Sequence, residues 1–558
     1  MNGGLENLNS LYEYYKSGDY FKAESGIRVR LERSPNDVQT LQLGALTALS
    51  MNQIVTAHER VDRATALMSM TAELANIRGR ILKASGDWAA AEDAYNLAIE
   101  LNPSYTQAKF NRLNLFVASE QPKRILEELS TDFDFGDVGA IAKVMALADL
   151  GHYRQALEAR QSFKNKSYTD QQTFHSIKCF AGLAQSKKLE DAFGTLPKSS
   201  PLFVKSLNVV VNFFEMRGLR DKLFSILEDV AADCPASVSV QVLNIRKILG
   251  QKQNIQNELK SLLKTCPEDI SVICKVADEA RLEGRFSESC DLYQRALQSL
   301  PGDLSIMVGY AQAAISDNQF NVAQTLLQAA LNQSPNSQLL LALVATLLRK
   351  MGREYKHLYD YKAFVRVYDI QPPSQFSNII DFNKALKKKL DQLHIYKNAP
   401  INQTLRHGSQ TELDLALVDD PILKSFFEAV DAPINDYIEH LADNYDHPLN
   451  RRRRDSYRIS GAWSIRLSED GHHVNHVHPM GWLSSAYYVD VPQSVNETSR
   501  EGWIQFGQPN LNIDLEAEHF VQPKVGRLVL FPSYMWHGTI PFKGPDTRLT
   551  LPFDVVPA

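Results

Sequence analysis

One spacing recurs along the first 350 residues of this 558-residue chain: a glycine is followed seventeen residues later by a proline. The pairs are Gly18 and Pro35, Gly86 and Pro103, Gly218 and Pro235, Gly250 and Pro267, Gly284 and Pro301, and, with asparagine in place of glycine, Asn318 and Pro335. Glycine permits the positive φ that ends one helix, and proline stops the next helix. Because Gly18 and Gly86 lie 68 residues apart, or two times 34, the spacing predicts tandem helical hairpins with a 34-residue period.

These hairpins resemble tetratricopeptide repeats. The resemblance is strong over residues 5–105 and 203–350, and it is weaker over 106–202, where the segment that begins at Gly151 carries the clearest signature. It implies a right-handed superhelix of about nine or ten helical pairs, each burying its apolar face against its neighbours. Such an array presents a groove to a peptide or protein. The alternative is an array that serves only as a scaffold or a dimerisation surface.

The composition changes in the last third of the chain. Ten of the fourteen histidines lie from His394 onward, and fifteen of the 24 prolines follow residue 370. Short alternating segments separated by prolines and glycines occupy residues 463–467, 485–489, 503–506, 527–531 and 548–553. This pattern predicts an antiparallel barrel or jelly roll of about eight strands. The candidate chemistry is therefore expected in the C-terminal part.

We accordingly expect a multidomain chain, with an all-α array followed by a β-rich domain. The repeat array is assigned to residues 1–355, a linker with support helices to 356–400, and the β-rich domain to 401–558, with its barrel core at about 455–556. Within the linker, residues 381–393 predict an amphipathic helix. The repeats and the barrel are expected to have separate cores.

The overall composition excludes several classes of protein. With 44% hydrophobic residues, 22% charged residues and a net charge of −5, the chain is typical of a globular protein without a general attraction to nucleic acid. The N-terminus lacks a basic segment followed by an apolar one, and the longest apolar run, 339–348, is too short to span a membrane. The five cysteines lack CxxC or Cys/His metal spacing. We expect a cytoplasmic protein with reduced cysteines that binds neither membrane nor nucleic acid.

A candidate metal site lies in the β-rich part. His476 and His478 are two residues apart, so on a strand they point to one face and can bind one metal ion together. His473 is expected on the other face unless a bulge intervenes. His537 ends a strand-and-turn segment and is the third candidate ligand. Arg548 and Thr550, also two residues apart, suit a dicarboxylic acid, because a guanidinium binds a carboxylate with two hydrogen bonds and a hydroxyl adds a third.

This order of residues resembles the Fe(II)/2-oxoglutarate-dependent oxygenases, and the surrounding segments look like the bacterial 2-oxoglutarate-Fe(II) oxygenase family found fused to tetratricopeptide repeats. The resemblance implies a double-stranded β-helix (jelly-roll) domain with Fe(II), 2-oxoglutarate as co-substrate and O2. It implies His476, His478 and His537 as metal ligands, with no catalytic residue beyond them, and Arg548 as the anchor of the co-substrate. Thr550 and Tyr487 are further candidates there, with strand propensity and core packing as their alternatives.

One position departs from the wider superfamily. Most members carry Asp or Glu two residues after the first His, where this chain has His478. The resulting all-histidine triad removes one negative charge from the metal site. The alternative is that His478 turns away, which leaves two protein ligands and a site completed by water or an anion.

The preferred hypothesis is an oxygenase that hydroxylates a protein or peptide captured by the repeats, with the oligomeric state open. Two alternatives remain. One is a tetratricopeptide adaptor with a catalytically inactive barrel. The other is a three-histidine, cupin-like dioxygenase that acts on a small molecule without 2-oxoglutarate, against which Arg548 argues.

Overall fold

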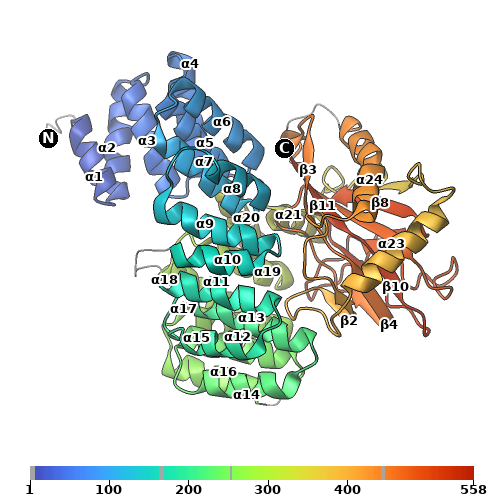
Figure 1. The fold of residues 1–558 in the computed structure, drawn as a ribbon. Coiled ribbons are helices and arrows are strands. Elements are labelled where there is room, and N and C mark those ends of the chain that lie inside the picture. The colour runs from blue at the N-terminus through green and yellow to red at the C-terminus, as the bar shows by residue number, and fades with distance from the viewer. Residues whose placement is uncertain (1–6, 163–168, 252–253, 442–445) are drawn as a thin grey trace. The chain divides into compact units, whose positions relative to one another are not determined.

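A computed structural model describes residues 7–162, 169–251, 254–441 and 446–558 of the chain. Helices occupy the first two thirds of the chain, and strands follow in the last third (Figure 1). This order confirms the predicted fold class. Within the described residues, no helix is both long enough and apolar enough to cross a membrane.

The helical part consists of consecutive pairs. In chain order the pairs are α1 (Leu8–Lys16) with α2 (Tyr20–Arg33), α3 (Val38–Ser50) with α4 (Ile54–Leu67), α5 (Ala72–Ala84) with α6 (Trp88–Leu101), α7 (Thr106–Ala118) with α8 (Pro122–Leu129), α9 (Gly136–Asp149) with α10 (Tyr153–Ala159), α11 (Thr169–Gly182) with α12 (Ser186–Gly194), α13 (Phe203–Met216) with α14 (Arg220–Ala231), α15 (Ala236–Ile248) with α16 (Ile255–Thr265), α17 (Ile270–Leu282) with α18 (Phe286–Ser299), and α19 (Leu304–Ser316) with α20 (Phe320–Gln333). A further helix, α21 (Gln338–Lys350), follows. The described chain thus holds ten pairs, within the predicted range.

A residue with positive φ ends the first helix of each pair. These residues are Gly18, Asn52, Gly86, Glu120, Gly151, Ala184, Gly218, Gly250, Gly284 and Asn318. The steps between them are 34 residues or slightly fewer. At positions 120 and 184 this left-handed backbone conformation is adopted by Glu120 and Ala184, residue types that adopt it less readily than glycine or asparagine. The repeats between residues 106 and 202 were therefore weak in the sequence, although the backbone there follows the same period.

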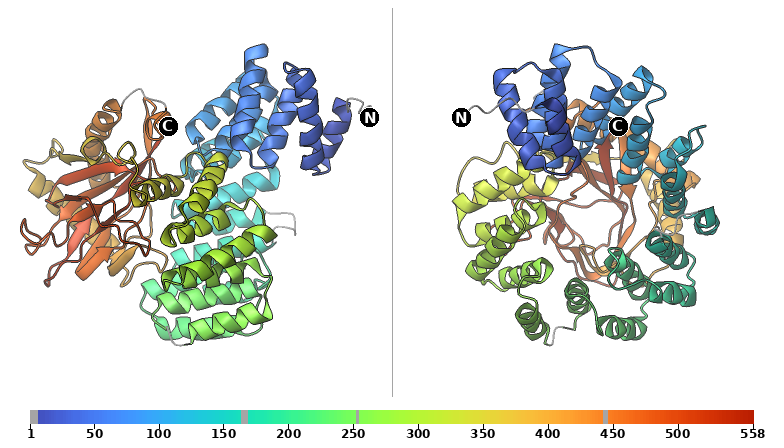
Figure 2. Two further views of the ribbon diagram at one scale, coloured as in Figure 1. Left: turned by 180° about the vertical axis from the view of Figure 1, so that it is seen from behind. Right: turned by 90° about the vertical axis from the view of Figure 1, so that its left-hand side faces the viewer.

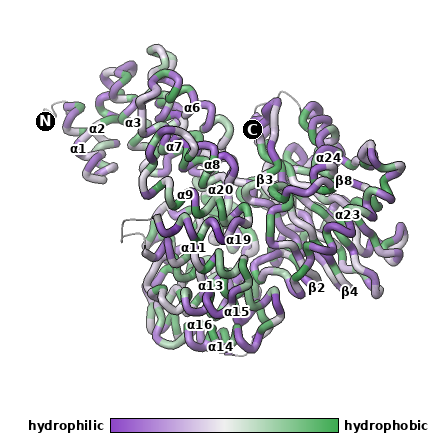
Figure 3. The backbone as a smooth tube through the Cα atoms, in the orientation of Figure 1, coloured by the Kyte–Doolittle hydropathy of each residue, from purple (hydrophilic) through white to green (hydrophobic). Residues whose placement is uncertain are grey.

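The described residues form two compact units. One contains the residues up to Thr131 together with Leu327–Ser337 and Ala558, and the other contains Asp132–Leu326 and Gln338–Pro557. Array helices in both units carry hydrophobic and hydrophilic residues along their length (Figure 3), as helices with one buried face do. The second unit holds later repeats together with the β-rich part.

The β-rich part contains eleven strands among the described residues. They are β1 (Arg366–Asp369), β2 (Leu405–Gln410), β3 (Tyr457–Ala462), β4 (Ile465–His473), β5 (Leu483–Asp490), β6 (Ile504–Phe506), β7 (His519–Val521), β8 (Arg527–Pro532), β9 (His537–Thr539), β10 (Arg548–Thr550) and β11 (Phe553–Pro557). Eight of them form one sheet in the order β1-β8-β5-β10-β4-β2, with β11 paired to β3 and β5, and β7-β6-β9 form a smaller sheet. All these pairs are antiparallel.

The segment predicted as a linker contributes to this domain. Strand β1 pairs with β8, where Arg366 lies opposite Leu530. The short helix α22 (Tyr361–Phe364) precedes β1, and α23 (Ile379–Leu393) confirms the predicted amphipathic helix. Helices α23 and α24 (Pro421–Glu439) lie along the sheet in the views of Figures 1 and 2. Residues 356–400 therefore belong structurally to the β-rich domain.

Helix α21 is joined to the β-rich domain inside the second unit. The Trp536 indole Nε1 donates a hydrogen bond to Thr346 Oγ1 at 3.0 Å, and both side chains are buried. Arg349 donates to the Gly507 carbonyl at 2.9 Å, and its Nε lies 3.3 Å from Glu518 Oε1. The last helix of the array thus contacts the segment that leads directly into β9.

A second joint connects the domain to α13. The Lys397 N–H donates to the Met216 carbonyl at 2.8 Å, at the C-terminal end of α13. The Ile401 N–H donates to Asn212 Oδ1 at 3.1 Å, and the Ile401 side chain is buried in the apolar cluster around α13. Gln403 and Thr404, which follow directly, reach the cavity described below.

Candidate metal centre and co-substrate cavity

Three histidine side chains meet where two segments of the β-rich domain run side by side. His476 and His478 lie in an extended segment after β4, and His537 begins β9. The two segments are held together by reciprocal backbone hydrogen bonds, His476 N to His537 O at 2.8 Å and His537 N to His476 O at 3.0 Å. One ring nitrogen of each histidine lies within 4.8 Å of the other two. The structure therefore brings the three predicted ligands together.

The hydrogen bonds of the rings fix their tautomers. His476 Nδ1 lies 2.9 Å from the Val474 carbonyl, and His537 Nδ1 lies 2.9 Å from the Met535 carbonyl. A carbonyl only accepts, so each Nδ1 carries the proton, and the same holds for His478 Nδ1, which faces the Asp554 carboxylate. In the neutral rings each Nε2 then carries a lone pair.

These lone pairs face a common point. His476 Nε2 and His478 Nε2 are 3.1 Å apart, close enough for both nitrogens to bind the same cation when their lone pairs are free. A metal ion held here would take both nitrogens as ligands, together with His537 Nε2. Burial, with a contribution from His478, lowers the pKa of His476 to about 3. Burial also lowers the pKa of His537 well below its usual value, so both rings are neutral at physiological pH and available as ligands.

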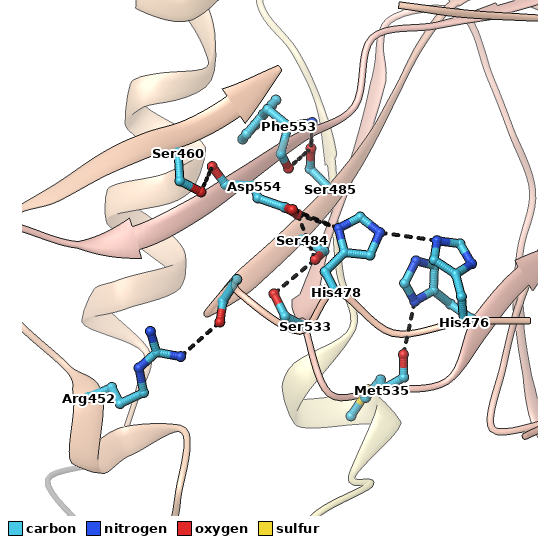
Figure 4. A network of polar contacts seen from close by, with 12 residues as sticks. Arg452, Ser460, His476, His478, Ser484, Ser485, Ser533, Met535, Phe553 and Asp554 are labelled. Atoms are coloured by element: carbon cyan, nitrogen blue, oxygen red, sulfur yellow. Dashed lines mark hydrogen bonds and ion pairs between the residues drawn. The ribbon is translucent and has the colours of Figure 1, made fainter. Parts of the chain in front are cut away.

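The His478 ring lies between His476 and the carboxylate of Asp554 (Figure 4). Its Nδ1 is 2.7 Å from both Oδ1 and Oδ2 of Asp554 on β11. Ser484 Oγ donates to Asp554 Oδ1 at 2.8 Å, and Ser484 lies opposite Asp554 in the pairing of β11 with β5. The buried guanidinium of Arg452 donates to the Gly481 carbonyl in the turn that follows His478. The ring therefore has a fixed orientation.

The triad opens into a cavity of about 350 Å³. Most of its lining is apolar, including Trp463, Val477, Met480, Ile504 and Phe531, and its polar residues include Gln403, Thr404, Gln410, Thr539, Arg548 and Thr550. Met480 is 62% exposed, so its side chain reaches solvent at the edge of the cavity. A cavity of this size accommodates a small dicarboxylate and part of a second molecule.

Arg548 is the main unpaired cation of this cavity. It is 2% exposed, and its Nη1 donates to the Gly502 carbonyl at 2.5 Å. Its Nε has no hydrogen-bond partner, and among the described residues no carboxylate pairs with it. Burial lowers the pKa of Arg548. Because an unpaired buried charge is costly, the chemistry of this pocket fits an anionic ligand.

The neighbours of Arg548 correct one prediction and support another. Thr550 lines the cavity from the same strand, as predicted. Tyr487 does not reach the cavity, because its hydroxyl donates to Asn383 Oδ1 on α23 and its ring packs against Phe426 of α24. Tyr488 lines the cavity instead, and its buried hydroxyl has no hydrogen-bond partner. The aromatic pair Tyr487-Tyr488 gave no signal for which member faces inward.

His473 also lines the cavity, although the alternation of a strand predicted the opposite face. Strand β4 ends at His473, and the irregular backbone that follows changes the alternation before His476. His473 Nδ1 lies 3.0 Å from Thr404 Oγ1. It is outside the group of three that converges on one point. Asp554 was missed in the sequence because it lies 76 residues from His478 and the two meet only through strand pairing.

Comparison with known proteins agrees with this geometry. Residues 461–554 match the family model described as Putative 2OG-Fe(II) oxygenase. Residues 280–347 match the model described as Tetratricopeptide repeat. Both resemblances predicted from the sequence are thus confirmed, and the first match spans all three histidines, Arg548 and Asp554. No curated protein matches the chain.

Solved structures similar to this chain fall into two groups. A chain of the APC/C hetero-tetramer Cut9-Hcn1 is 12% identical with a TM-score of 0.31, over 62% of this chain and 70% of that one. HygX from Streptomyces hygroscopicus, with nickel and 2-oxoglutarate bound, is 13% identical with a TM-score of 0.24, over 37% of this chain and 87% of that one. A prolyl-4-hydroxylase from Pseudomonas putida is 14% identical with a TM-score of 0.24, over 36% of this chain and 98% of that one.

Proposed function

We propose that the chain is an Fe(II)- and 2-oxoglutarate-dependent oxygenase that hydroxylates its substrate. One observation carries the proposal: a single cavity contains three imidazole lone pairs that require a cation and a buried guanidinium that requires an anion. The match of residues 461–554 to the oxygenase family supports the choice of iron and 2-oxoglutarate for these two positions.

Each residue has a defined role in this proposal. His476, His478 and His537 hold the metal through Nε2, and Arg548, with Thr550 and Tyr488 beside it, binds the far carboxylate of 2-oxoglutarate. The apolar lining excludes water from the reacting region. When bound, Fe(II) with 2-oxoglutarate and O2 supplies the chemistry that inserts one oxygen atom into a C–H bond while 2-oxoglutarate becomes succinate and CO2.

Anaerobic titration of the full chain with Fe(II) and then 2-oxoglutarate tests the proposal. Chelation of the metal by 2-oxoglutarate is expected to give a visible charge-transfer band. His476→Ala and His537→Ala are expected to abolish the band without loss of helical content. His472→Ala is the matched control, because His472 neighbours His473 on β4 but does not line the cavity.

The same titration separates the alternatives. An adaptor with an inactive barrel predicts no band. A cupin-like dioxygenase that works without 2-oxoglutarate predicts metal binding without the band. Either result in the unsubstituted chain would contradict the proposed function.

The proposal extends to the substrate, which we take to be a protein or peptide captured by the repeats. Ten helical pairs and α21 precede the catalytic domain, and repeat arrays commonly bind extended protein segments. A capture surface next to the reaction centre raises the local concentration of a weakly bound substrate. We also propose a cytoplasmic location, for which the support is the spacing of the five cysteines in the sequence, typical of reduced core residues.

Mass spectrometry tests the protein-substrate proposal. Proteins from cells with the active enzyme are compared with proteins from cells carrying only His537→Ala. A recurring site that gains the mass of one oxygen atom in the active cells alone supports the proposal. Full turnover of a metabolite by the enzyme, with no such site in any protein, would contradict it.

A further inference from the structure

The three ligands of the candidate metal site differ in what lies behind them. His476 and His537 each donate their Nδ1 proton to a neutral backbone carbonyl, of Val474 and Met535 respectively. His478 alone donates to a carboxylate, that of Asp554. It is also the ligand at the position where the wider superfamily carries Asp or Glu. Among the residues that the structure describes, the carboxylate that contacts the triad therefore lies behind the histidine at the position of a carboxylate ligand.

The carboxylate of Asp554 faces the His478 ring. Both of its oxygens lie 2.7 Å from His478 Nδ1, and the two side chains are each 15% exposed. Among the described residues, no lysine or arginine pairs with this carboxylate. Its other side-chain partner is the neutral hydroxyl of Ser484, which is itself fully buried and held by Ser533 Oγ at 2.9 Å.

A carboxylate that accepts the Nδ1 proton of a metal-bound imidazole makes that imidazole a stronger, more anionic ligand and fixes its orientation. We propose that Asp554 is a positioning residue that supplies, through His478, the negative charge that a carboxylate ligand provides elsewhere. The Asp554 carboxylate would act on the metal through the His478 ring, to which it is joined by the hydrogen bond from Nδ1. This inference rests on the proposed function, because it assumes that the triad binds a metal.

Asp554→Asn tests the inference in the full chain. The amide oxygen of asparagine can still accept from His478 Nδ1 and from Ser484, so the substitution removes the charge with little change of shape. Loss of such a partner typically lowers metal affinity about 10–100-fold. We expect this decrease for Fe(II) under anaerobic conditions, and a shift of the ligand-field absorption bands of the Co(II)-loaded protein. Asp490→Asn is the matched control, because Asp490 ends β5 outside the cavity lining.

A rescue experiment distinguishes charge from structure. His478→Asp combined with Asp554→Asn moves the carboxylate to the metal and is expected to restore Fe(II) affinity to within a few-fold of the unsubstituted chain. His478→Asp alone is expected to bind less tightly than this double variant, since Asp554 then faces a second carboxylate instead of its donor. A residue that only ties β11 to β5 would show no such rescue.

Two results would overturn the inference. One is unchanged Fe(II) affinity and unchanged Co(II) bands in Asp554→Asn. The other is a double variant that folds, as judged by circular dichroism, and binds no better than Asp554→Asn. Failure of the unsubstituted chain to bind Fe(II) would instead contradict the proposed function, so the two failures are distinguishable.

Discussion

At the scale of single residues, opposite charge requirements meet in one cavity. The Nε2 lone pairs of His476 and His478 face each other at 3.1 Å, and Arg548 is buried with an unsatisfied Nε. Neither arrangement is favourable by itself, because buried polar groups cost free energy when they lack partners. The cavity is therefore arranged for ligands, and the sites for cation and anion can be tested separately.

Arg548→Met should weaken 2-oxoglutarate binding without affecting Fe(II) binding. Removing one partner of a buried ion pair costs about 3–5 kcal/mol, which corresponds to more than about a hundredfold in affinity. The concentration of 2-oxoglutarate that half-saturates the charge-transfer band gives the first quantity, and the preceding Fe(II) titration gives the second. An unchanged 2-oxoglutarate affinity would remove Arg548 from the co-substrate site.

His394 should make the metal-free protein less stable in mild acid. The ring is buried between Ser409 and Ser464, and burial with the nearby Arg466 charge lowers its pKa from 6.5 to about 4. Between these two pH values the unfolded chain binds a proton that the folded chain does not, so stability falls as pH decreases through this window.

Urea unfolding followed by tryptophan fluorescence at pH 7 and pH 5 measures this effect. His394→Gln should show a smaller loss of stability between the two pH values, by up to roughly 1.4 kcal/mol per pH unit for one proton. The comparison with the unsubstituted chain isolates His394 from other buried histidines. An identical pH dependence in both proteins would exclude the residue as the cause.

Residue spacing predicted those cavity residues that are close together in the sequence or belong to an ordered motif. His476, His478, His537, Arg548 and Thr550 were found because period-two alternation and motif order identify them. Tyr487 was predicted at the co-substrate site, whereas Tyr488 lines the cavity, because two adjacent tyrosines do not reveal in the sequence which one faces inward. Asp554 was not found because its contact with His478 depends on the register of β11 against β5.

At the scale of elements, the contact between α21 and the start of β9 joins the array to the candidate metal site. Trp536 donates to Thr346 on α21, and the next residue, His537, is a proposed ligand. The backbone N–H of Trp536 also donates to the Tyr359 hydroxyl, which in turn donates to the Tyr534 carbonyl. Three hydrogen bonds thus position the segment in front of His537.

Thr346→Val should weaken Fe(II) binding although Thr346 is a residue of the repeats. The substitution leaves the buried Trp536 N–H without an acceptor, which costs about 1–3 kcal/mol. Part of this cost should appear as a several-fold loss of Fe(II) affinity, measured by titration. Thr47→Val is the matched control, because Thr47 is buried in α3 and makes the same hydrogen bond to the carbonyl four residues earlier. Equal behaviour of the two variants would contradict the coupling.

The helical elements were more predictable than the strands, for a physical reason. A hairpin depends on local signals, and the left-handed turns at Gly86 and Gly284 follow from glycine. The turns at Glu120 and Ala184 were hidden because the neighbouring helices impose that conformation on ordinary residues. Strand β1 was assigned to a linker because four residues carry little signal until β8 pairs with them.

At the scale of the whole molecule, the β-rich domain does not begin where the composition of the sequence changes. Arg349, Tyr355 and Tyr361 all contact Glu518, and Ile401 is buried against α13. Arg349 and Tyr355 lie in the segment assigned to the array, and Tyr361 lies in the segment assigned to the linker. Ile401 begins the segment assigned to the β-rich domain, so the contacts cross both predicted boundaries. The β-rich domain therefore makes contacts with residues that precede its strands.

A shortened chain that begins at Pro373 should lose Fe(II) binding. It lacks β1, α21 and Tyr359, so β8 becomes an open sheet edge and the segment before His537 loses its partners. A chain that begins at Gln338 retains all three and should bind Fe(II) more tightly than the shorter one. Titration and circular dichroism of both measure the difference. Fe(II) affinity equal to that of the full chain in the Pro373 version would show that the barrel folds alone.

The contact between Thr346 and Trp536 also bears on the order of folding during synthesis. The two residues are 190 positions apart, and α21 leaves the ribosome long before any histidine of the triad. Helical repeats form through short-range contacts and fold quickly, whereas β1 must wait for β8 to close a long-range pairing. We therefore expect the finished repeats to present Thr346 and Arg349 as a preformed template for the β-rich domain, so that the array serves as an intramolecular folding aid for the domain that follows it.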